Sequence, residues 1–377
     1  MKEIDPKVDE AIQTLNMKDG PTRRRLLSGA GLVSATAAAS ALLTACSSAT
    51  KAGGTTGAGN FPETPKWKFW FVNHVTSNPF FVPTTYGAAD ASALLNCSYN
   101  WGGSKTSSVP EMVSYMNTAI SGKADGIAVA VIDTKAFTTP TANAMSQGIP
   151  VVSYNADGAV GNPGTARLAY VGQDLFVSGQ ELGKRIVESM PQGGDAVGFI
   201  ATPGTLNIQP RIDGAKDSIT KSGKNIKFQE IASGAELAQE TTTINSYILS
   251  HKSTLKGIFA VDAGSTQTVG QMIQKYGLQQ QVASGGFDLN PITLDMINKG
   301  NLGFTIDQQP YLQGFLPVVY LYLWKLSGGL VSPPETNTGL KFVTKSTVGP
   351  YLTTTSRFEG STSAQKYIQR SGPIPTS

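Results

Sequence analysis

Residues 127–155 read IAVAVIDTKAFTTPTANAMSQGIPVVSYN, and their pattern is the clearest indication of the fold class. Two short runs in it, 127–132 and 151–154, are apolar. Such runs are typical of strands that are buried on both faces of a sheet. A helical candidate at 135–147 lies between them and ends before a Gly-Ile-Pro stop. A strand, a helix and a second strand in this order predict a parallel sheet covered by helices.

The same alternation continues in both directions along the chain. Other short strands are expected at 68–72, 196–201, 258–261 and 284–287. Other helices are expected at 79–96, 109–121, 175–190, 208–222, 237–250, 266–276, 291–299 and 311–326. Two comparable sets of strands and helices, one after the other, indicate two similar lobes.

The length of the chain also favours two lobes, since 377 residues exceed the size at which a single core stops growing. The sequence therefore predicts an α/β protein with two Rossmann-like lobes, each a mainly parallel sheet flanked by helices. We expect the N-terminal lobe at 66–172 plus 309–339, and the C-terminal lobe with its tail at 173–308 plus 340–377. The chain would then cross three times between the lobes and form a hinge.

Polar residues follow the expected strands at the points where the strands end. In chain order they are Asn73, His74 and Asn78, then Asp133, then Asn155 and Asp157, then Asp262, then Asp288. Ligands of open α/β sheets bind outside the carboxyl ends of the strands. Two lobes that face each other with such edges would close over a small polar molecule by a hinge movement.

The first 45 residues have the order of a secretory signal peptide: a charged segment, an apolar segment and a cleavage site. Arg23, Arg24 and Arg25 precede an uncharged stretch at 26–45, as in the twin-arginine export signal. Export by the general route is the alternative. The stretch could also be a permanent transmembrane helix, but its glycines, serines and threonines disfavour that interpretation.

Leu43-Thr44-Ala45-Cys46 resembles a bacterial lipobox, in which the cysteine thiol receives a diacylglycerol group. The residues that follow are rich in Gly, Ser, Thr and Ala, so 46–65 is interpreted as a lipidated, flexible tether. We therefore expect the protein to be anchored through Cys46 to the cell membrane, on its extracytoplasmic (periplasmic or outer) face.

Composition excludes several other functions. A formal net charge of +4 without charged blocks is too weak for a nucleic-acid-binding surface. His74 and His251 are the only histidines and lie far apart, and neither a nucleophile motif nor a phosphate-binding loop nor a metal-ligand spacing occurs. We expect a monomer that is not an enzyme and has no cofactor, no bound metal and no nucleic-acid partner.

Six short motifs occur in the order in which they occur in a known family. They are Asn78-Pro79-Phe80-Phe81, Gly148-Ile149-Pro150-Val151-Val152-Ser153-Tyr154-Asn155, Arg211-Ile212-Asp213-Gly214, Phe259-Ala260-Val261-Asp262, Gly286-Phe287-Asp288 and Thr305-Ile306-Asp307-Gln308-Gln309-Pro310. Together they resemble the sugar-binding branch of the type I periplasmic binding proteins, the family of ribose-binding protein. The resemblance covers about 66–329.

The resemblance implies a solute-binding lipoprotein that delivers a monosaccharide or small sugar alcohol to the permease subunits of an ABC importer. A receptor for a sugar-like signal that acts on a membrane sensor is the alternative, and these residues do not separate the two. The implied ligand site combines aromatic planes for the C–H faces of the sugar with carboxylates, amides and a guanidinium for its hydroxyls. Its residues are Asn78, Phe80, Phe81, Asn155, Arg211, Asp262, Asp288 and Gln308.

Several of these residues also have a structural interpretation. Adjacent Phe residues after a Pro are usually core, Asp288 could cap the helix that begins at Pro291, and Arg211 could pair with Asp213 or Asp217 on a solvated face. Asp133 and Asp157 are helix-cap candidates, and Trp101 is either a third aromatic plane after the second strand or a surface residue.

Two departures from the family pattern bear on the ligand. Asn155-Ala156 stands where the family often has Asp-Arg, and Asp262 stands where ribose binders tend to have Asn. These departures disfavour ribose and leave another pentose, a hexose or a linear polyol.

Overall fold

A computed structural model describes residues 61–158, 167–330 and 332–364. The expected signal peptide (1–45), the lipidation site Cys46 and the rest of the tether up to 60 lie outside the described residues, and so does the tail at 365–377. Within the described ranges, none of the helices combines the length and apolar character needed to cross a membrane.

The first sheet has six parallel strands in the order β11-β5-β4-β3-β1-β2. Its strands are β1 (Lys68–Asn73), β2 (Ser98–Gly103), β3 (Gly126–Val129), β4 (Val151–Tyr154), β5 (Tyr170–Gly172) and β11 (Glu335–Asn337). Alternate residues face opposite sides of a strand, and here both sides are covered. Phe69 and Phe71 of β1 belong to one buried apolar cluster, while Val72 of the same strand belongs to another.

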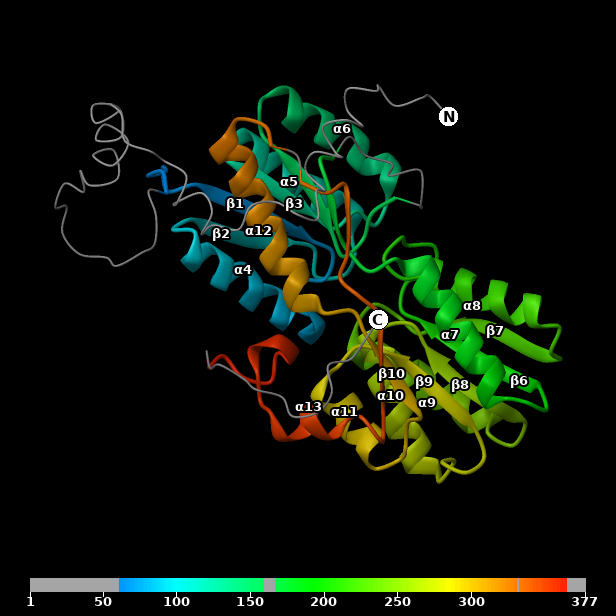
Figure 1. The fold of residues 1–377 in the computed structure, drawn as a ribbon. Coiled ribbons are helices and arrows are strands. Elements are labelled where there is room, and N and C mark those ends of the chain that lie inside the picture. Colours follow the sequence, from blue (N-terminus) through cyan, green and yellow to red (C-terminus); the bar gives the residue numbers. More distant parts are fainter. Residues whose placement is uncertain (1–60, 159–166, 331, 365–377) are drawn as a thin grey trace, which may run out of the picture. The chain divides into compact units, whose positions relative to one another are not determined.

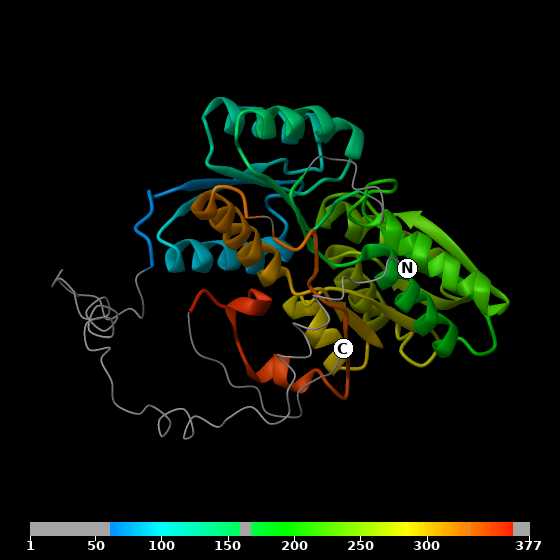
Figure 2. The same ribbon diagram turned by 45° about the horizontal axis from the view of Figure 1, so that its top comes forward.

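Helices form a layer on each face of this sheet (Figures 1 and 2). On one face α4 (Val82–Leu94) lies alongside α12 (Pro310–Ser327), a helix from far along the chain. On the other face α5 (Val109–Ser121) and α6 (Thr134–Ser146) pack against the strands. The segment 127–155, which predicted a strand, a helix and a parallel strand, forms β3, α6 and β4 as expected.

The second sheet has the order β12-β10-β9-β8-β6-β7, and only the pair β10 and β12 is antiparallel. Its strands are β6 (Gly194–Ile200), β7 (Ile226–Ala232), β8 (Leu255–Ala260), β9 (Ala283–Phe287), β10 (Phe304–Asp307) and β12 (Lys341–Thr344). Its helices are α7 (Leu175–Ser189) and α8 (Gln209–Ser222) with one apolar cluster, and α9 (Leu237–His251), α10 (Ala263–Tyr276) and α11 (Pro291–Asn298) with another. The expected fold class, two mainly parallel sheets flanked by helices, is confirmed.

The chain passes between the two sheets at three points: between β5 and α7, between β10 and α12, and between β11 and β12. After β12 the short helix α13 (Gly349–Thr353) packs against α11 of the second sheet. The 3₁₀ turn η2 (Arg357–Glu359) then returns to the first sheet, where it contacts α4 and α12. The sequence placed 340–377 with the second lobe, whereas η2 packs on helices of the first.

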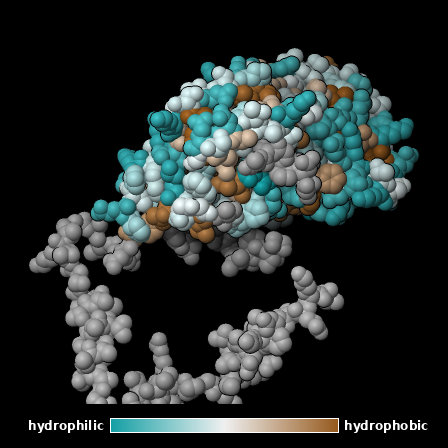
Figure 3. Space-filling view, turned by 90° about the horizontal axis from the view of Figure 1, so that it is seen from above, coloured by the Kyte–Doolittle hydropathy of each residue, from teal (hydrophilic) through white to brown (hydrophobic). Residues whose placement is uncertain are grey.

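The expected helices and buried strands occur at nearly the expected positions. One difference is at the start of the helix expected at 79–96, which begins with a 3₁₀ turn, η1 (Pro79–Phe81), before α4. Trp101 lies within β2 instead of after it. On the face shown in Figure 3, apolar residues are scattered among hydrophilic ones, as is ordinary for a protein surface.

Candidate ligand-binding site

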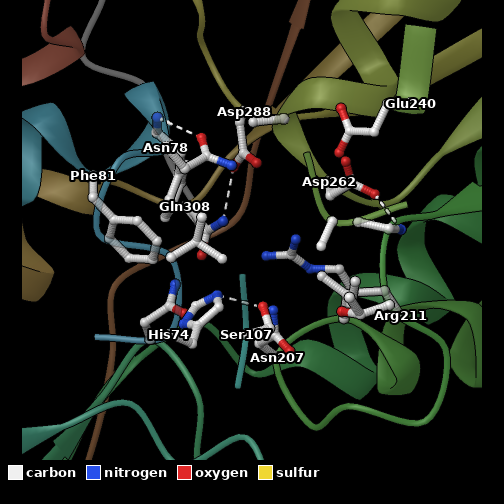
Figure 4. A pocket seen from close by; sticks show the side chains of 18 residues that line it. His74, Asn78, Phe81, Ser107, Asn207, Arg211, Glu240, Asp262, Asp288 and Gln308 are labelled. Carbon is white, nitrogen blue, oxygen red and sulfur yellow. Dashed lines mark hydrogen bonds between the residues drawn. The ribbon is translucent and has the colours of Figure 1, made fainter. Parts of the chain in front are cut away.

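A cavity of about 60 Å³ lies between the carboxyl ends of the strands of the two sheets. A single water needs roughly 10–15 Å³ of such space, so the cavity suits a small ligand. Its lining comes from both sheets, as Figure 4 shows. All eight residues expected in the site line it: Asn78, Phe80, Phe81, Asn155, Arg211, Asp262, Asp288 and Gln308. Their contact with a ligand stays a prediction.

Two of these residues have an unusual backbone conformation. Asn155 follows β4 directly and has φ 62°, and Asp288 follows β9 directly and has φ 77°. Non-glycine residues seldom adopt positive φ, which costs on the order of 1–3 kcal/mol, and such residues concentrate at functional sites. Equivalent positions in the two lobes thus carry the same strained turn, and each contributes a polar side chain to the cavity wall.

The aromatic part of the wall is built by the turn η1. Asn78 is its N-cap, since the Asn78 Oδ1 accepts a hydrogen bond from the Phe80 backbone N–H at 2.9 Å. The rings of Phe80 and Phe81 meet edge to face, with centroids 4.7 Å apart. Both are buried, at 8% and 3% exposure, and both belong to the apolar core of the first sheet. Each therefore combines the two roles considered from the sequence: the rings pack on the core and also line the cavity.

A chain of buried amides joins the two sides of the cavity. The Gln308 Nε2 donates to the Asp288 Oδ1 at 2.7 Å, and the Gln313 Nε2 donates to the Gln308 Oε1 at 3.1 Å. The Asn155 Nδ2 donates to the Gln313 Oε1 at 3.1 Å. Asn155 follows a strand of the first sheet and Asp288 follows a strand of the second, so the network passes through the hinge segment between them. The sequence analysis missed Gln313, which is fully buried in the first turn of α12.

Arg211 is 2% exposed and does not pair with Asp213 or Asp217 on a solvated face. Its Nη1 donates to the Val261 carbonyl at 2.8 Å, and its Nη2 donates to the Gln173 Oε1 at 3.0 Å. The guanidinium also lies over the Phe287 ring, 4.1 Å from its centroid. These contacts fix the plane of the guanidinium, and its Nε has no hydrogen-bond partner among the described residues. A buried donor of this kind is available to a ligand.

Asp288 faces this guanidinium across the cavity (Figure 4). Burial raises the pKa of Asp288 to about 6, although the Arg211 charge and the Gln308 hydrogen bond oppose the shift. The sequence left open that Asp288 caps the next helix. In the structure the N-cap of α11 is Asn290, so the side chain of Asp288 is not used as a cap.

Asp262 is the residue of the site that does cap a helix. Its Oδ1 accepts from the Ser265 N–H at 2.9 Å, which makes it the N-cap of α10, and its Oδ2 accepts from the Ala201 N–H at 3.0 Å. Burial raises the pKa of Asp262 while these hydrogen bonds lower it. Each oxygen thus already accepts one backbone hydrogen bond and keeps a second lone pair for a further donor.

Five polar residues of the cavity wall were missing from the sequence-based site. They are His74, Ser107, Thr202, Asn207 and Glu240. The Asn207 Nδ2 and the His74 Nε2 lie 3.1 Å apart and join the two lobes across the cavity. Burial lowers the pKa of His74 to about 4, so the ring is neutral near pH 7. The position of His74 directly after the first strand was the one available signal for it.

The remaining candidates have structural roles. Asp133 is the N-cap of α6, as was considered from the sequence. Asp157 forms an ion pair with Arg167 at 2.5 Å, and neither residue lines the cavity. Trp101 packs beside Phe81, with ring centroids 5.9 Å apart, and is also absent from the cavity wall.

Comparison with known proteins agrees with this geometry. The periplasmic binding protein domain matches residues 69–324. The xylose/arabinose-binding protein XylF of Sulfolobus acidocaldarius is 49% identical over 319 residues, which cover 82% of this chain and 78% of that protein.

Solved structures resemble the fold at lower identity. A carbohydrate transporter from Acidothermus cellulolyticus, in complex with myo-inositol, has a TM-score of 0.68 at 26% identity and covers 77% of this chain and 98% of its own. An ABC transporter solute-binding protein from Burkholderia graminis, in complex with D-arabinose, has a TM-score of 0.70 at 23% identity, with 77% and 99% covered.

The domain match covers most of the described residues, and the match to XylF covers a still larger part of the chain. The members compared are solute-binding proteins and not enzymes, as expected from the sequence. This chain therefore belongs to the periplasmic binding protein family and has its type I fold of two sheets around one cavity.

Proposed function

We propose that this chain binds a small neutral sugar in the cavity between its two sheets and presents it to an ABC importer. One observation supports the proposal above others: a single cavity gathers two Phe rings, the carboxyl groups of Asp262 and Asp288, a buried guanidinium and several amides from both lobes. Such a set matches the hydroxyls and C–H faces of a sugar.

The chemistry of each group supports this ligand class. The ring planes of Phe80 and Phe81 give dispersion contact with the C–H faces of a sugar ring. Asp288 accepts hydroxyl hydrogen bonds, and the unpartnered Arg211 Nε donates one. Hydrogen bonds to charged groups contribute about 1.5–3 kcal/mol each, so a few of them reach the ~8 kcal/mol of a micromolar complex.

A pentose aldose is the ligand that we propose. The relative with 49% identity is named for xylose and arabinose, and two residues of this site depart from the pattern of ribose binders. D-xylose and L-arabinose are therefore the first ligands to test, with D-arabinose and myo-inositol next because solved structures of the same fold hold them.

Ligand binding is coupled to the hinge movement of the two lobes. The ligand contacts both lobes, so it stabilises the closed arrangement through contacts that an open arrangement lacks. The hydrogen bond between His74 and Asn207 joins the lobes on one side of the cavity, and the Asn155–Gln313–Gln308 chain joins them at the hinge. These contacts align the two strand-end edges before the ligand adds its own.

Export and anchoring are part of the proposal. The leader at 1–45 and Cys46 support a lipoprotein on the extracytoplasmic face of the cell membrane. The Cys46→Ser variant should move from the membrane fraction to the soluble fraction, while Cys97→Ser should stay in the membrane fraction. A Cys46→Ser protein that sediments with membranes as the wild type does would contradict the lipid anchor.

A thermal-shift panel tests the ligand class. We expect D-xylose or L-arabinose to raise the unfolding temperature of the full chain, because a ligand that binds only the folded form stabilises it by RT ln(1 + [L]/Kd). Hexoses and C4–C6 polyols provide the comparison, and sodium chloride at equal osmolarity is the control. No shift with any sugar or polyol would contradict the proposed function.

A further inference from the structure

Glu240 is a buried acid in the wall of the cavity that the proposed function leaves unused. It lies on α9, lines the cavity and is 2% exposed. Its Oε2 has no hydrogen-bond partner among the described residues. Figure 4 shows its carboxyl group pointing toward that of Asp262, which is half-buried. Two carboxyl groups in contact within a buried wall form an unusual pair, because two adjacent negative charges repel strongly there.

Gly264 leaves the space in which the Glu240 carboxyl group lies beside Asp262. A Cβ on Gly264 would lie 1.8 Å from the Glu240 Oε2 and 2.6 Å from its Cδ, so no side chain fits between Glu240 and the first turn of α10. Gly264 does not have positive φ, so its backbone conformation does not require glycine. Its lack of a side chain therefore serves to seat the Glu240 carboxyl beside Asp262.

The surrounding charges do not neutralise a second carboxylate. Within the described ranges, the cation beside the pair is Arg211 of α8, whose charge acts on Asp262 and Asp288 together. Asp288, after β9, adds a further acid to the same wall. On α9 itself the nearest acid is Glu236, which is exposed. Burial and the neighbouring Asp262 raise the pKa of Glu240 to about 9.

We propose that Glu240 and Asp262 share one proton and act as a single hydrogen-bonding unit of the ligand site, so that binding requires this proton. The inference rests on the proposed function, since it concerns how the same cavity holds its sugar. With one proton, which bridges the two carboxyl groups, the pair carries one negative charge beside Arg211, and its remaining lone pairs accept hydrogen bonds from ligand hydroxyls. Without the proton the pair carries two charges, and the cost of burying them rises when the ligand displaces solvent.

The shared proton has consequences for stability as well as binding. In the unfolded chain Glu240 ionises near its ordinary pKa of about 4.3. In the folded chain its pKa is raised, so the folded state holds one more proton between those two values. Unfolding then releases a proton, and stability falls as pH rises through this window, by up to about tenfold per pH unit in the folding equilibrium constant. Affinity for a neutral sugar falls above about pH 9 for the same reason.

Glu240→Gln separates this proposal from a conventional carboxylate contact. The amide keeps a donor and an acceptor but cannot ionise. We expect the affinity of Glu240→Gln for D-xylose or L-arabinose to be the same at pH 7 and at pH 9.5, whereas the affinity of the wild type falls over this range. Without ligand, the unfolding temperature of the wild type should fall relative to that of Glu240→Gln as pH rises from 6 to 9. Glu236→Gln, one turn earlier on the same helix, is the matched control and should follow the wild type throughout.

Other outcomes overturn the proposal. If Glu240 were an ionised acceptor of sugar hydroxyls, the Kd of Glu240→Gln would exceed that of the wild type by the same factor at pH 7 and at pH 9.5. If the wild type keeps the same affinity and unfolding temperature from pH 7 to 9.5, no proton is shared, whether or not the variant folds. If no sugar binds the wild type, the proposed function fails, while the unfolding measurements without ligand still test the proton.

Discussion

Asp288 and Asn155 show how single residues carry the site. Each lies at the first position after a strand, each has positive φ, and each turns a polar side chain into the cavity wall. Buried polar groups need partners, and the amide chain through Gln308 and Gln313 supplies them without filling the cavity. The ligand site therefore explains the strained backbone of Asn155 and Asp288 and the buried Asp288 carboxyl group. Neither feature stabilises the fold.

The raised pKa of Asp288 predicts a pH limit on binding. A carboxylate accepts hydroxyl hydrogen bonds better than a protonated carboxyl does, so a bound sugar lowers the pKa of Asp288 below its free value of about 6. Affinity is then fully present above that pH and falls as pH drops through it, with Kd at pH 5 about tenfold above Kd at pH 7. Calorimetric titration of D-xylose or L-arabinose at the two pH values measures this. Asp288→Asn should bind weakly with little pH dependence, and an equal wild-type Kd at both values would contradict the role of Asp288.

Residue types were predictable where they stand in a local pattern. Each of the eight expected residues follows the end of a strand or lies at the start of a helix. The structure brings all eight to one cavity. Asp262 was expected only as a ligand group, yet its oxygens also cap α10 and bind Ala201. Ser107, Asn207 and Glu240 lie on loops and a helix away from the strand ends, so only the folded arrangement reveals them.

Close backbone contact between α7 and α8 positions one side of the site. A Cβ on Gly179 of α7 would lie 2.3 Å from the Arg211 carbonyl oxygen of α8, and one on Gly214 of α8 would lie 2.2 Å from the Phe176 carbonyl oxygen of α7. The two glycines thus let α7 and α8 approach along their whole contact. Arg211 is on α8, so the separation of these helices sets where the guanidinium lies.

The Gly179→Ala variant tests this contact between α7 and α8. The added methyl group forces α7 and α8 apart, which should cost about 1–3 kcal/mol in the free energy of unfolding. It should also weaken sugar binding, because Arg211 moves with α8. Denaturant unfolding and titration measure the two effects. Gly349→Ala is the control, since its Cβ would meet nothing within 4 Å and its φ is not positive. Full stability of Gly179→Ala would contradict the contact.

Burial made several elements predictable but not all of them: the four residues of β10 are fully buried, yet no strand was assigned to them from the sequence. The fully buried β3 and β4 form continuous apolar runs and were found from the sequence. The edge strands β2 and β7 are only partly buried, so they lack such runs, and no boundaries were assigned to them. The three-residue strands β5 and β11 are too short for any pattern, and their pairing depends on residues far apart in the chain.

The whole molecule is a pair of sheets held at three crossings and by one further segment. After the third crossing the chain adds β12 to the second sheet and α13 beside α11, and then η2 reaches the first sheet. There the Arg357 Nη2 and Nε donate to the two Asp90 carboxylate oxygens at 2.6 and 2.9 Å. No local pattern predicts this return, because Arg357 and Asp90 lie far apart in the chain and meet only through the fold.

A single calorimetric titration shows whether a sugar binds in the cavity between the two sheets. The full chain is titrated at pH 7.5 with D-xylose and with L-arabinose, beside the Asp288→Ala variant. The account predicts one bound sugar per wild-type chain and a Kd that rises more than about tenfold in the variant, whose unfolding temperature is not lowered. Binding of neither sugar, or equal affinity in wild type and variant, would contradict it.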